Sequence, residues 1–236
     1  MIHLPGPAPD LLAAAPLTLA ATIDLRAPTR PLTLDADHPL LHLGAHLAMA
    51  GTMGGNATLD LPDLAPLAAI SKVDLAGAAH VTLNGALPGT GPARADLAGD
   101  IAIHGGMAPI PALLGERAHL AAAAHFARTG GDVPEAALTL DSRTLSLAAA
   151  GGLAGGLLGL HWHLALADLG ALDSALAGKL AADGKIAGKP DDLALDARLV
   201  GNVGAAPLPM TPFAVTLAAT SLPVAPGAPV AYWRPE

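Results

Sequence analysis

Histidine and acidic side chains carry most of the metal-binding and acid–base chemistry in this chain, which has 10 His and 20 Asp or Glu. His161 and His163 are two residues apart, and His42 and His46 are four apart. Two imidazoles at the closer spacing can share a metal ion if a carboxylate joins them. In both segments, however, leucines occupy the alternate positions. We therefore expect these histidines on a solvated strand face, with no metal bound.

Acidic pairs are the second candidate for chemistry. Asp96 pairs with Asp100 and Asp192 with Asp196, each at a spacing that puts both carboxylates on one strand face. Acid–base catalysis needs a pocket that shifts a pKa, and the alternation with leucine predicts a solvated face instead. The sequence has no nucleophile elbow and no phosphate-loop spacing. We expect no enzyme activity, no catalytic residue and no cofactor.

The elements that carry these residues are predicted by an apolar–polar alternation with a period of two. It is clearest over 40–51, 158–168 and 191–201. Successive strand side chains point to opposite faces, so such segments build an antiparallel sheet with one apolar and one solvated face.

Turn-forming segments separate thirteen candidate strands. They are expected at about 16–26, 32–36, 40–50, 56–61, 74–87, 93–104, 117–128, 135–141, 144–150, 157–167, 176–187, 191–200 and 212–219. Short helices are expected at 63–70, 109–115 and 168–178, where Asp63 and Asp168 are candidate N-caps. The uncharged stretch 144–167 is interpreted as two strands around a glycine-rich bend at 148–156, not as a membrane span. The predicted class is all-β with a few short helices.

Composition narrows the possible partners. The chain is 52% hydrophobic but only 2% aromatic, so its apolar surface is aliphatic. A net charge of −8 argues against nucleic-acid binding, which needs a basic stripe. The absence of Cys excludes disulfides and thiolate chemistry.

A degenerate repeat of about 100 residues organises the chain. Residues 63–89 match 168–188: a short helix, Leu-Ala-Gly, then a strand expected to end in an Asn-Gly or Asp-Gly hairpin turn. A unit that cannot bury its own apolar face predicts a stacked, elongated array. We divide the chain into partial N-terminal repeat strands (1–56), a first repeat unit (57–160) and a second, incomplete one (161–236).

Three stretches, 63–87, 140–153 and 167–201, resemble the periplasmic repeats of the TamB family and the wider AsmA-like superfamily. TamB is the inner-membrane-anchored subunit of the translocation and assembly module. The resemblance spans roughly residues 57–205. The chain lacks that family's N-terminal anchor and C-terminal domain, so the resemblance implies an internal segment.

The resemblance implies a curled, taco-like sheet whose groove is hydrophobic, in a periplasmic protein of cell-envelope and outer-membrane biogenesis. The implied function is phospholipid transport between the inner and outer membranes. The implied partners are phospholipid acyl chains and, through regions outside this chain, an outer-membrane β-barrel protein. The alternation places the following residues on the apolar face, as the candidate lipid-groove lining: Leu43, Leu47, Val81, Leu83, Leu97, Ile101, Ile103, Leu138, Leu140, Leu145, Leu147, Leu160, Trp162, Leu164, Leu193, Leu195 and Leu199.

Three alternatives remain open. The same apolar residues could form the core of a closed β-sandwich. The chain could be a chaperone-like surface whose sheet edges add a strand from a client, or a structural β-solenoid. Prolines near both ends argue against strand addition: Pro5, Pro7, Pro9, Pro223, Pro226 and Pro229.

Overall fold

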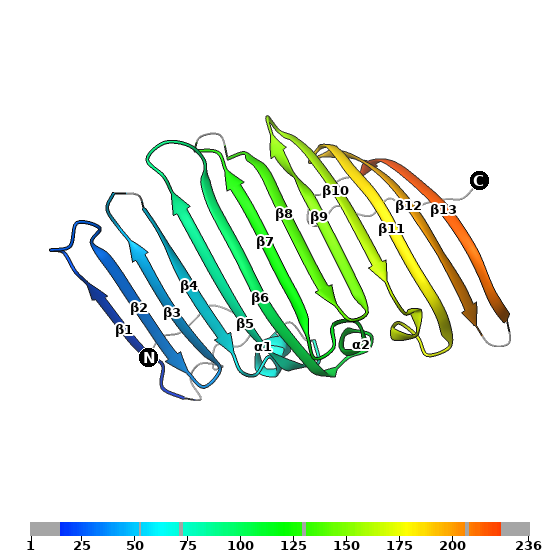
Figure 1. Cartoon of the computed structure of the whole chain (residues 1–236), viewed down its shortest axis with the longest axis horizontal. Helices are drawn as coiled ribbons and strands as arrows, with labels where there is room; N and C mark the ends of the chain where they lie inside the picture. Colours follow the sequence, from blue (N-terminus) through cyan, green and yellow to red (C-terminus); the bar gives the residue numbers. More distant parts are fainter. Residues whose placement is uncertain (1–14, 52, 71–72, 129–130, 206–207, 223–236) are drawn as a thin grey trace.

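One antiparallel sheet of thirteen strands makes up the computed structural model, in which each strand pairs with the strands before and after it in the sequence (Figure 1). The structure describes residues 15–51, 53–70, 73–128, 131–205 and 208–222. The strands are β1 (Thr18–Ile23), β2 (Pro31–His38), β3 (Leu41–Ala48), β4 (Met53–Leu61), β5 (Leu75–Leu87), β6 (Ala93–Gly106), β7 (Ala118–Phe126), β8 (Val133–Ser142), β9 (Leu145–Ala154), β10 (Leu157–Leu166), β11 (Leu176–Lys189), β12 (Asp192–Ala205) and β13 (Leu208–Leu222).

All thirteen predicted strands are present, in order, with ends that differ by a few residues. The sheet is curled and does not close on itself, which confirms the predicted all-β class. The closed-sandwich alternative is wrong, because the described strands form one layer and not two. The β-solenoid alternative is wrong too, since each strand pairs with its sequence neighbours in a meander instead of coiling.

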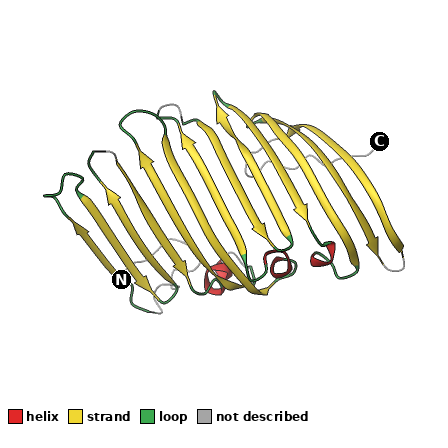
Figure 2. Ribbon diagram, viewed as in Figure 1, coloured by secondary structure: helices red, strands yellow, loops and turns green. Residues whose placement is uncertain are grey.

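Short helices lie at one end of the strands, and we call this margin of the sheet the helix edge (Figure 2). They are α1 (Ala65–Ile70), α2 (Ile110–Leu114) and the 3₁₀ turn η1 (Leu169–Ala171). The Asp63 side chain accepts a hydrogen bond from the Ala65 N–H at 2.9 Å, and Asp168 accepts one from Gly170 at 2.8 Å. Asp168 is therefore confirmed as the cap of η1, and Asp63, two residues before α1, accepts a backbone N–H at the start of that helix. The helix predicted over 168–178 is a single turn. Its C-terminal part instead begins β11, because strand pairing satisfies more backbone groups there than a short helix would.

The glycine-rich bend predicted at 148–156 is confined to its last two residues. Gly151 and Gly152 lie within β9, paired with β10, and the turn is formed by Gly155 and Gly156 alone. These two residues have φ angles of 58° and 75°, as a two-residue hairpin turn requires. The interpretation of 144–167 as two strands is confirmed. Among the described residues, no helix has the length and hydropathy needed to cross a membrane.

The two units of the sequence repeat form one continuous sheet, without a boundary between them. The predicted boundaries at 56/57 and 160/161 fall inside β4 and β10. Asn84–Gly85 and Asp183–Gly184 were expected to form hairpin turns, but they lie inside β5 and β11. In both places the alternation and the cross-strand pairing continue past the glycine. The repeat therefore marks equivalent long strands within one sheet.

Burial is limited because the sheet is one layer thick. Ile103 is 2% exposed and Leu169 6%, and both lie at the helix edge. The Ile103 N–H donates to the carbonyl oxygen of Gly115, which follows α2, at 2.8 Å. Most other large apolar side chains are half-buried or exposed, so much of the aliphatic surface stays accessible.

Candidate functional site: the apolar face of the sheet

All seventeen predicted lining residues lie on one face of the sheet. Cross-strand partners share a face, so the pairing register fixes this placement. One row crosses eight strands, from β3 to β10. It reads Leu43, Leu59, Val81, Gly99, Leu120, Leu140, Leu147 and Leu164.

The lining residues differ in accessibility. Leu47, Leu83 and Leu138 are 41%, 44% and 38% exposed, as expected of a surface that could contact a ligand. Ile103 and Leu193 are 2% and 4% exposed and belong to the small core. The other twelve are half-buried. The apolar face is thus an accessible aliphatic surface with buried residues near its margins.

A hollow of about 490 Å³ lies on this face, at the edge opposite the helices. Gly55, Gly85 and Ala95 are cross-strand neighbours in its floor, on β4, β5 and β6. Larger apolar side chains surround them: Leu32, Leu47, Met49, Met53, Leu83, Leu87 and Phe126. A Cβ added at Gly85 would meet only the Arg94 carbonyl oxygen, at 3.9 Å. The hollow therefore exists partly because this position carries no side chain.

Trp162 is the largest side chain in the predicted lining. Its indole lies over Gly184, its cross-strand partner on β11, so closely that a Cβ at residue 184 would lie 2.5 Å from the indole Nε1. The glycine provides the space in which the ring rests against the backbone. This contact fills the sheet surface locally without needing a second layer.

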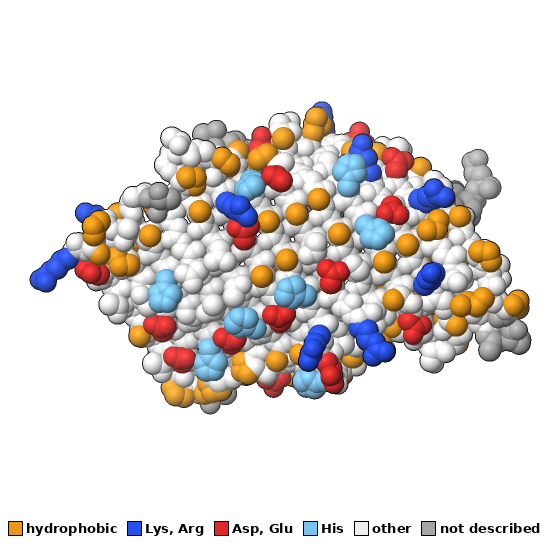
Figure 3. Space-filling model, in the orientation of Figure 1, with side chains coloured by type: hydrophobic (Ala, Val, Ile, Leu, Met, Phe, Trp, Pro, Cys, Tyr) orange, Lys and Arg blue, Asp and Glu red, His pale blue; other side chains and the backbone are white. Residues whose placement is uncertain are grey.

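The opposite face is polar and is shown in Figure 3, where imidazoles and carboxylates stand among small side chains. One cross-strand row on this face alternates acid and histidine over seven consecutive strands. We call it the Asp–His ladder: Asp37, His42, Asp60, His80, Asp100, His119 and Asp141, on β2 to β8.

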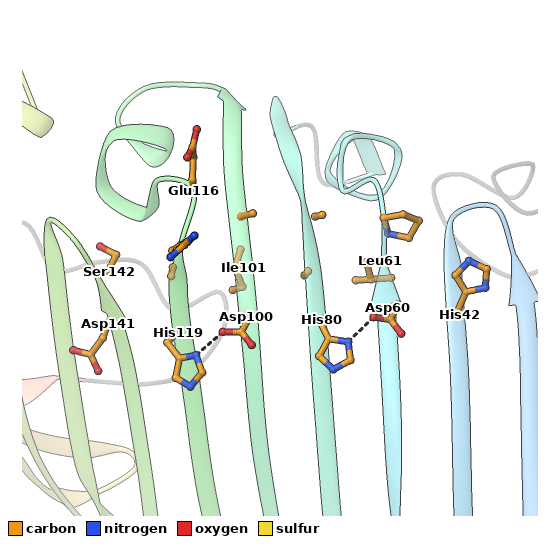
Figure 4. Close-up of a pocket in the computed structure, with 16 residues that line it drawn as sticks. His42, Asp60, Leu61, His80, Asp100, Ile101, Glu116, His119, Asp141 and Ser142 are labelled. Carbon is orange, nitrogen blue, oxygen red and sulfur yellow. Dashed lines mark hydrogen bonds and ion pairs between the residues drawn. The ribbon is translucent and has the colours of Figure 1, made fainter.

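Hydrogen bonds join the ladder in pairs. His42 Nδ1 donates to Asp37 at 2.9 Å and His119 Nδ1 to Asp100 at 2.6 Å, and His80 donates to Asp60. Figure 4 shows the last two pairs at a hollow of about 650 Å³ near the helix edge. Their side chains are 47% to 71% exposed, so these are solvated cross-strand pairs. Such pairs stabilise a register, each by about 0.2–1 kcal/mol.

One ion pair on this face shifts two pKa values. The Arg94 guanidinium donates to both carboxylate oxygens of Asp96, at 2.7 and 2.8 Å. This hydrogen bonding lowers the pKa of Asp96 and raises the pKa of Arg94 from their ordinary values. Both groups stay charged at neutral pH.

The histidines and acidic pairs lie where the alternation predicted. His42, His46, His161 and His163 are exposed on the polar face, as are Asp100, Asp192 and Asp196, while Asp96 is half-buried there. The two carboxylates of each acidic pair are four residues apart along their strand, so their Cα atoms are about 13 Å apart. Within the described ranges, no group of three or more His, Asp or Glu side chains could hold a metal ion.

Sequence reasoning missed two features of the site. Leu59 and Leu120 belong to the central apolar row, and the alternation of β4 and β7 could have identified them. The Asp–His ladder joins residues from seven strands, and only the register between strands brings them together. No protein-family model matches the sequence, and no curated protein or solved structure is significantly similar to it.

Proposed function

We propose that the apolar face binds the acyl chains of phospholipids and that the chain is a non-enzymatic segment of a lipid conduit. The observation that carries this proposal is an aliphatic face that spans the sheet and remains accessible on a single layer. At about 4.8 Å per strand, thirteen strands give a surface roughly 58 Å long. Accessible apolar patches of this size mark lipid or protein contact sites.

The composition of the face favours hydrocarbon as the ligand. Its side chains are mainly Leu, Ile, Val and Ala, and Trp162 is its one indole among the described residues. Acyl chains lying on it would gain about 0.8 kcal/mol for each buried methylene. Headgroups would stay hydrated, because the sheet is open. Transfer in this mechanism is passive and needs no catalytic side chain.

The cellular setting is part of the same proposal and rests on the sequence resemblance. We place the segment in the periplasm, within an inner-membrane-anchored TamB-like or AsmA-like protein of outer-membrane biogenesis. An outer-membrane β-barrel partner would bind through regions outside this chain.

Two pairs of matched substitutions test the acyl-chain site. Gly85→Leu fills the hollow on the apolar face, whereas Gly159→Leu adds the same side chain to the polar face, where a Cβ meets nothing within 4 Å. Leucine adds four carbons, which displace about four methylenes worth about 3 kcal/mol, or roughly 100-fold in affinity. Leu164→Arg and Ala165→Arg form the second pair, on opposite faces of β10.

The measurements are native mass spectrometry with lipid extraction, on the chain purified from a bacterial envelope fraction, and binding of a fluorescent palmitate analogue. Co-purified phospholipid that is lost in Leu164→Arg and kept in Ala165→Arg supports the proposal. So does a roughly 100-fold weaker palmitate affinity in Gly85→Leu but not in Gly159→Leu. Equal binding by both members of each pair, in folded proteins, refutes it.

Strand addition at the edge of the sheet is a second candidate, favoured by β1. Its sequence, TLAATI, contains no proline and no charge, and all six residues are exposed. Such an edge can pair with a strand from a client protein. At the other edge β13 contains Pro209 and Pro212, which have no N–H to donate to an added strand. The six terminal prolines noted above lie outside the described residues. Ala20→Pro should abolish binding of an extended client peptide if β1 is the docking edge, and unchanged binding would exclude it.

A further inference from the structure

The two histidines of β10 form a second constellation on the polar face, away from the Asp–His ladder. His161 and His163 are both exposed and, two residues apart, lie on the same side of the strand. Their Cα atoms are therefore about 6.6 Å apart. At this separation two imidazoles can turn toward one point above the strand.

Strand β9 leaves room on its side of that point, whereas β11 presents Lys185 and Asp183 on the other side. On β9 the cross-strand partners of His161 and His163 are Ala150 and Ala148. Their methyl groups, with Ala137 on β8, help to line a hollow of about 450 Å³ that also contains both imidazoles. The hollow is open to solvent on the polar face. A bound cation could keep its water ligands there.

Asp183 on β11 orients one of the imidazoles. His163 Nδ1 donates to the Asp183 carboxylate at 2.7 Å, and the two residues are direct cross-strand partners. This bond holds the ring in the tautomer whose Nε2 lone pair is free to bind a metal. Histidine ligands of metal ions commonly donate their other ring N–H to a carboxylate in this way.

We propose that His161 and His163 chelate a divalent transition-metal ion that prefers imidazole, of the Cu²⁺, Ni²⁺ and Zn²⁺ class, with Asp183 as the positioning residue of His163. Water completes the coordination, since no third protein ligand converges on this point within the described residues. Among divalent ions, Cu²⁺ binds such nitrogen sites most tightly. The Asp183 carboxylate fixes the tautomer and orientation of His163, which the i, i+2 spacing of the two imidazoles does not do by itself.

Other histidine pairs of the polar face are more widely spaced than His161 and His163. His42 and His46 are four residues apart on β3, so their Cα atoms are about 13 Å apart. Histidines of the Asp–His ladder lie on alternate strands, about 9.6 Å apart. The shorter spacing therefore makes His161 and His163 the most favourable pair for a two-nitrogen chelate. A two-nitrogen site is therefore distinguishable from background binding by its spectrum as well as its affinity.

A substitution at Lys185 should strengthen metal binding instead of weakening it. It is the cross-strand partner of His161 on β11, and its ammonium group repels a cation bound there. Lys185→Gln removes the charge and keeps a side chain of similar length. This substitution should raise the metal affinity several-fold, whereas loss of a ligand should lower it.

The experiment is a Cu²⁺ titration of the full chain by calorimetry, with electron paramagnetic resonance to count coordinated nitrogens. We expect one tightest site with two nitrogens. His161→Ala or His163→Ala should weaken it at least 10-fold and leave one nitrogen. Asp183→Asn should weaken it about 10-fold, the lower end of the usual range for such positioning residues. His46→Ala is the matched control and should change neither quantity.

Two results would overturn the proposal. One is a two-nitrogen signal and an unchanged affinity in both His161→Ala and His163→Ala. The other is a wild-type affinity no higher than that of the double variant His161→Ala/His163→Ala. Circular dichroism of each variant checks that the sheet is intact, as expected for exposed side chains. Neither result depends on acyl-chain binding, so this proposal and the conduit fail or succeed separately.

Discussion

The contact between Trp162 and Gly184 yields a sharp prediction for stability. Gly184→Ala places a Cβ 2.5 Å from the indole Nε1 of Trp162, far inside the 3.5–4.0 Å at which non-bonded atoms attract. The ring must leave its place on the sheet, or the strands must separate locally. The apolar face should lose stability even though alanine is the more favourable residue within a strand.

The magnitude follows from two opposed effects. Overpacking a well-filled contact costs about 1–3 kcal/mol. Replacing a strand glycine by alanine returns about 0.5–1 kcal/mol of chain entropy. Taking the centres of these two ranges, the net free energy of unfolding should fall by about 1.3 kcal/mol. With a urea m-value of about 2.5 kcal/mol/M, the unfolding midpoint should fall by about 0.5 M.

Urea denaturation followed by far-ultraviolet circular dichroism measures this shift. In a Trp162→Ala background the overlap is gone, so Gly184→Ala should there be neutral or stabilising. Gly159→Ala, on the polar face with nothing within 4 Å of the new Cβ, is the control and should not destabilise. If Gly184→Ala lowers the midpoint equally in both backgrounds, or does not lower it with Trp162 present, the reasoning is refuted.

Three further predictions concern the polar groups. Ser142 Oγ donates to the Leu113 carbonyl oxygen of α2 at 2.5 Å and accepts the Leu145 N–H at 2.9 Å. Ser142→Ala should therefore lower the free energy of unfolding by about 1–2 kcal/mol. Amide hydrogen exchange in α2 should accelerate, and unchanged exchange would contradict the role of this bond. Arg94→Gln should return the pKa of Asp96 upward toward its ordinary value, measured by NMR titration. Because the folded pKa of Asp96 is lowered, this pair stabilises the fold above the ordinary carboxyl pKa, and the effect is lost as the pH falls through the lowered value. A double-mutant cycle on His119 and Asp100 should give a coupling energy of about 0.2–1 kcal/mol at neutral pH, and a cycle that closes at zero would show that this rung of the ladder is not coupled.

Local sequence patterns were sufficient for the strands and for the division into two faces. The alternation around Leu43 and Leu164 assigns each side chain to a face, because side chains point to opposite faces with a period of two. The caps at Asp63 and Asp168 were also predictable, since a side-chain oxygen before a short apolar run can accept a backbone N–H. The length of the helix after Asp168 was not predictable from the local sequence. The turn after Asp168 ends early because β11 pairs with strands on both sides.

Tertiary structure alone decided what lies across each strand. Register decides the pairing of His163 with Asp183 and of Trp162 with Gly184, as well as the Asp–His ladder. These partners are 5 to 22 residues apart in the sequence. A one-residue shift would move each side chain to the other face, so only the complete set of strand pairings specifies these contacts. The sequence by itself determined the strands and their apolar faces, because these follow from local alternation. The single open layer, its hollows and its cross-strand pairs required the fold, because they depend on which strands become neighbours and in which register.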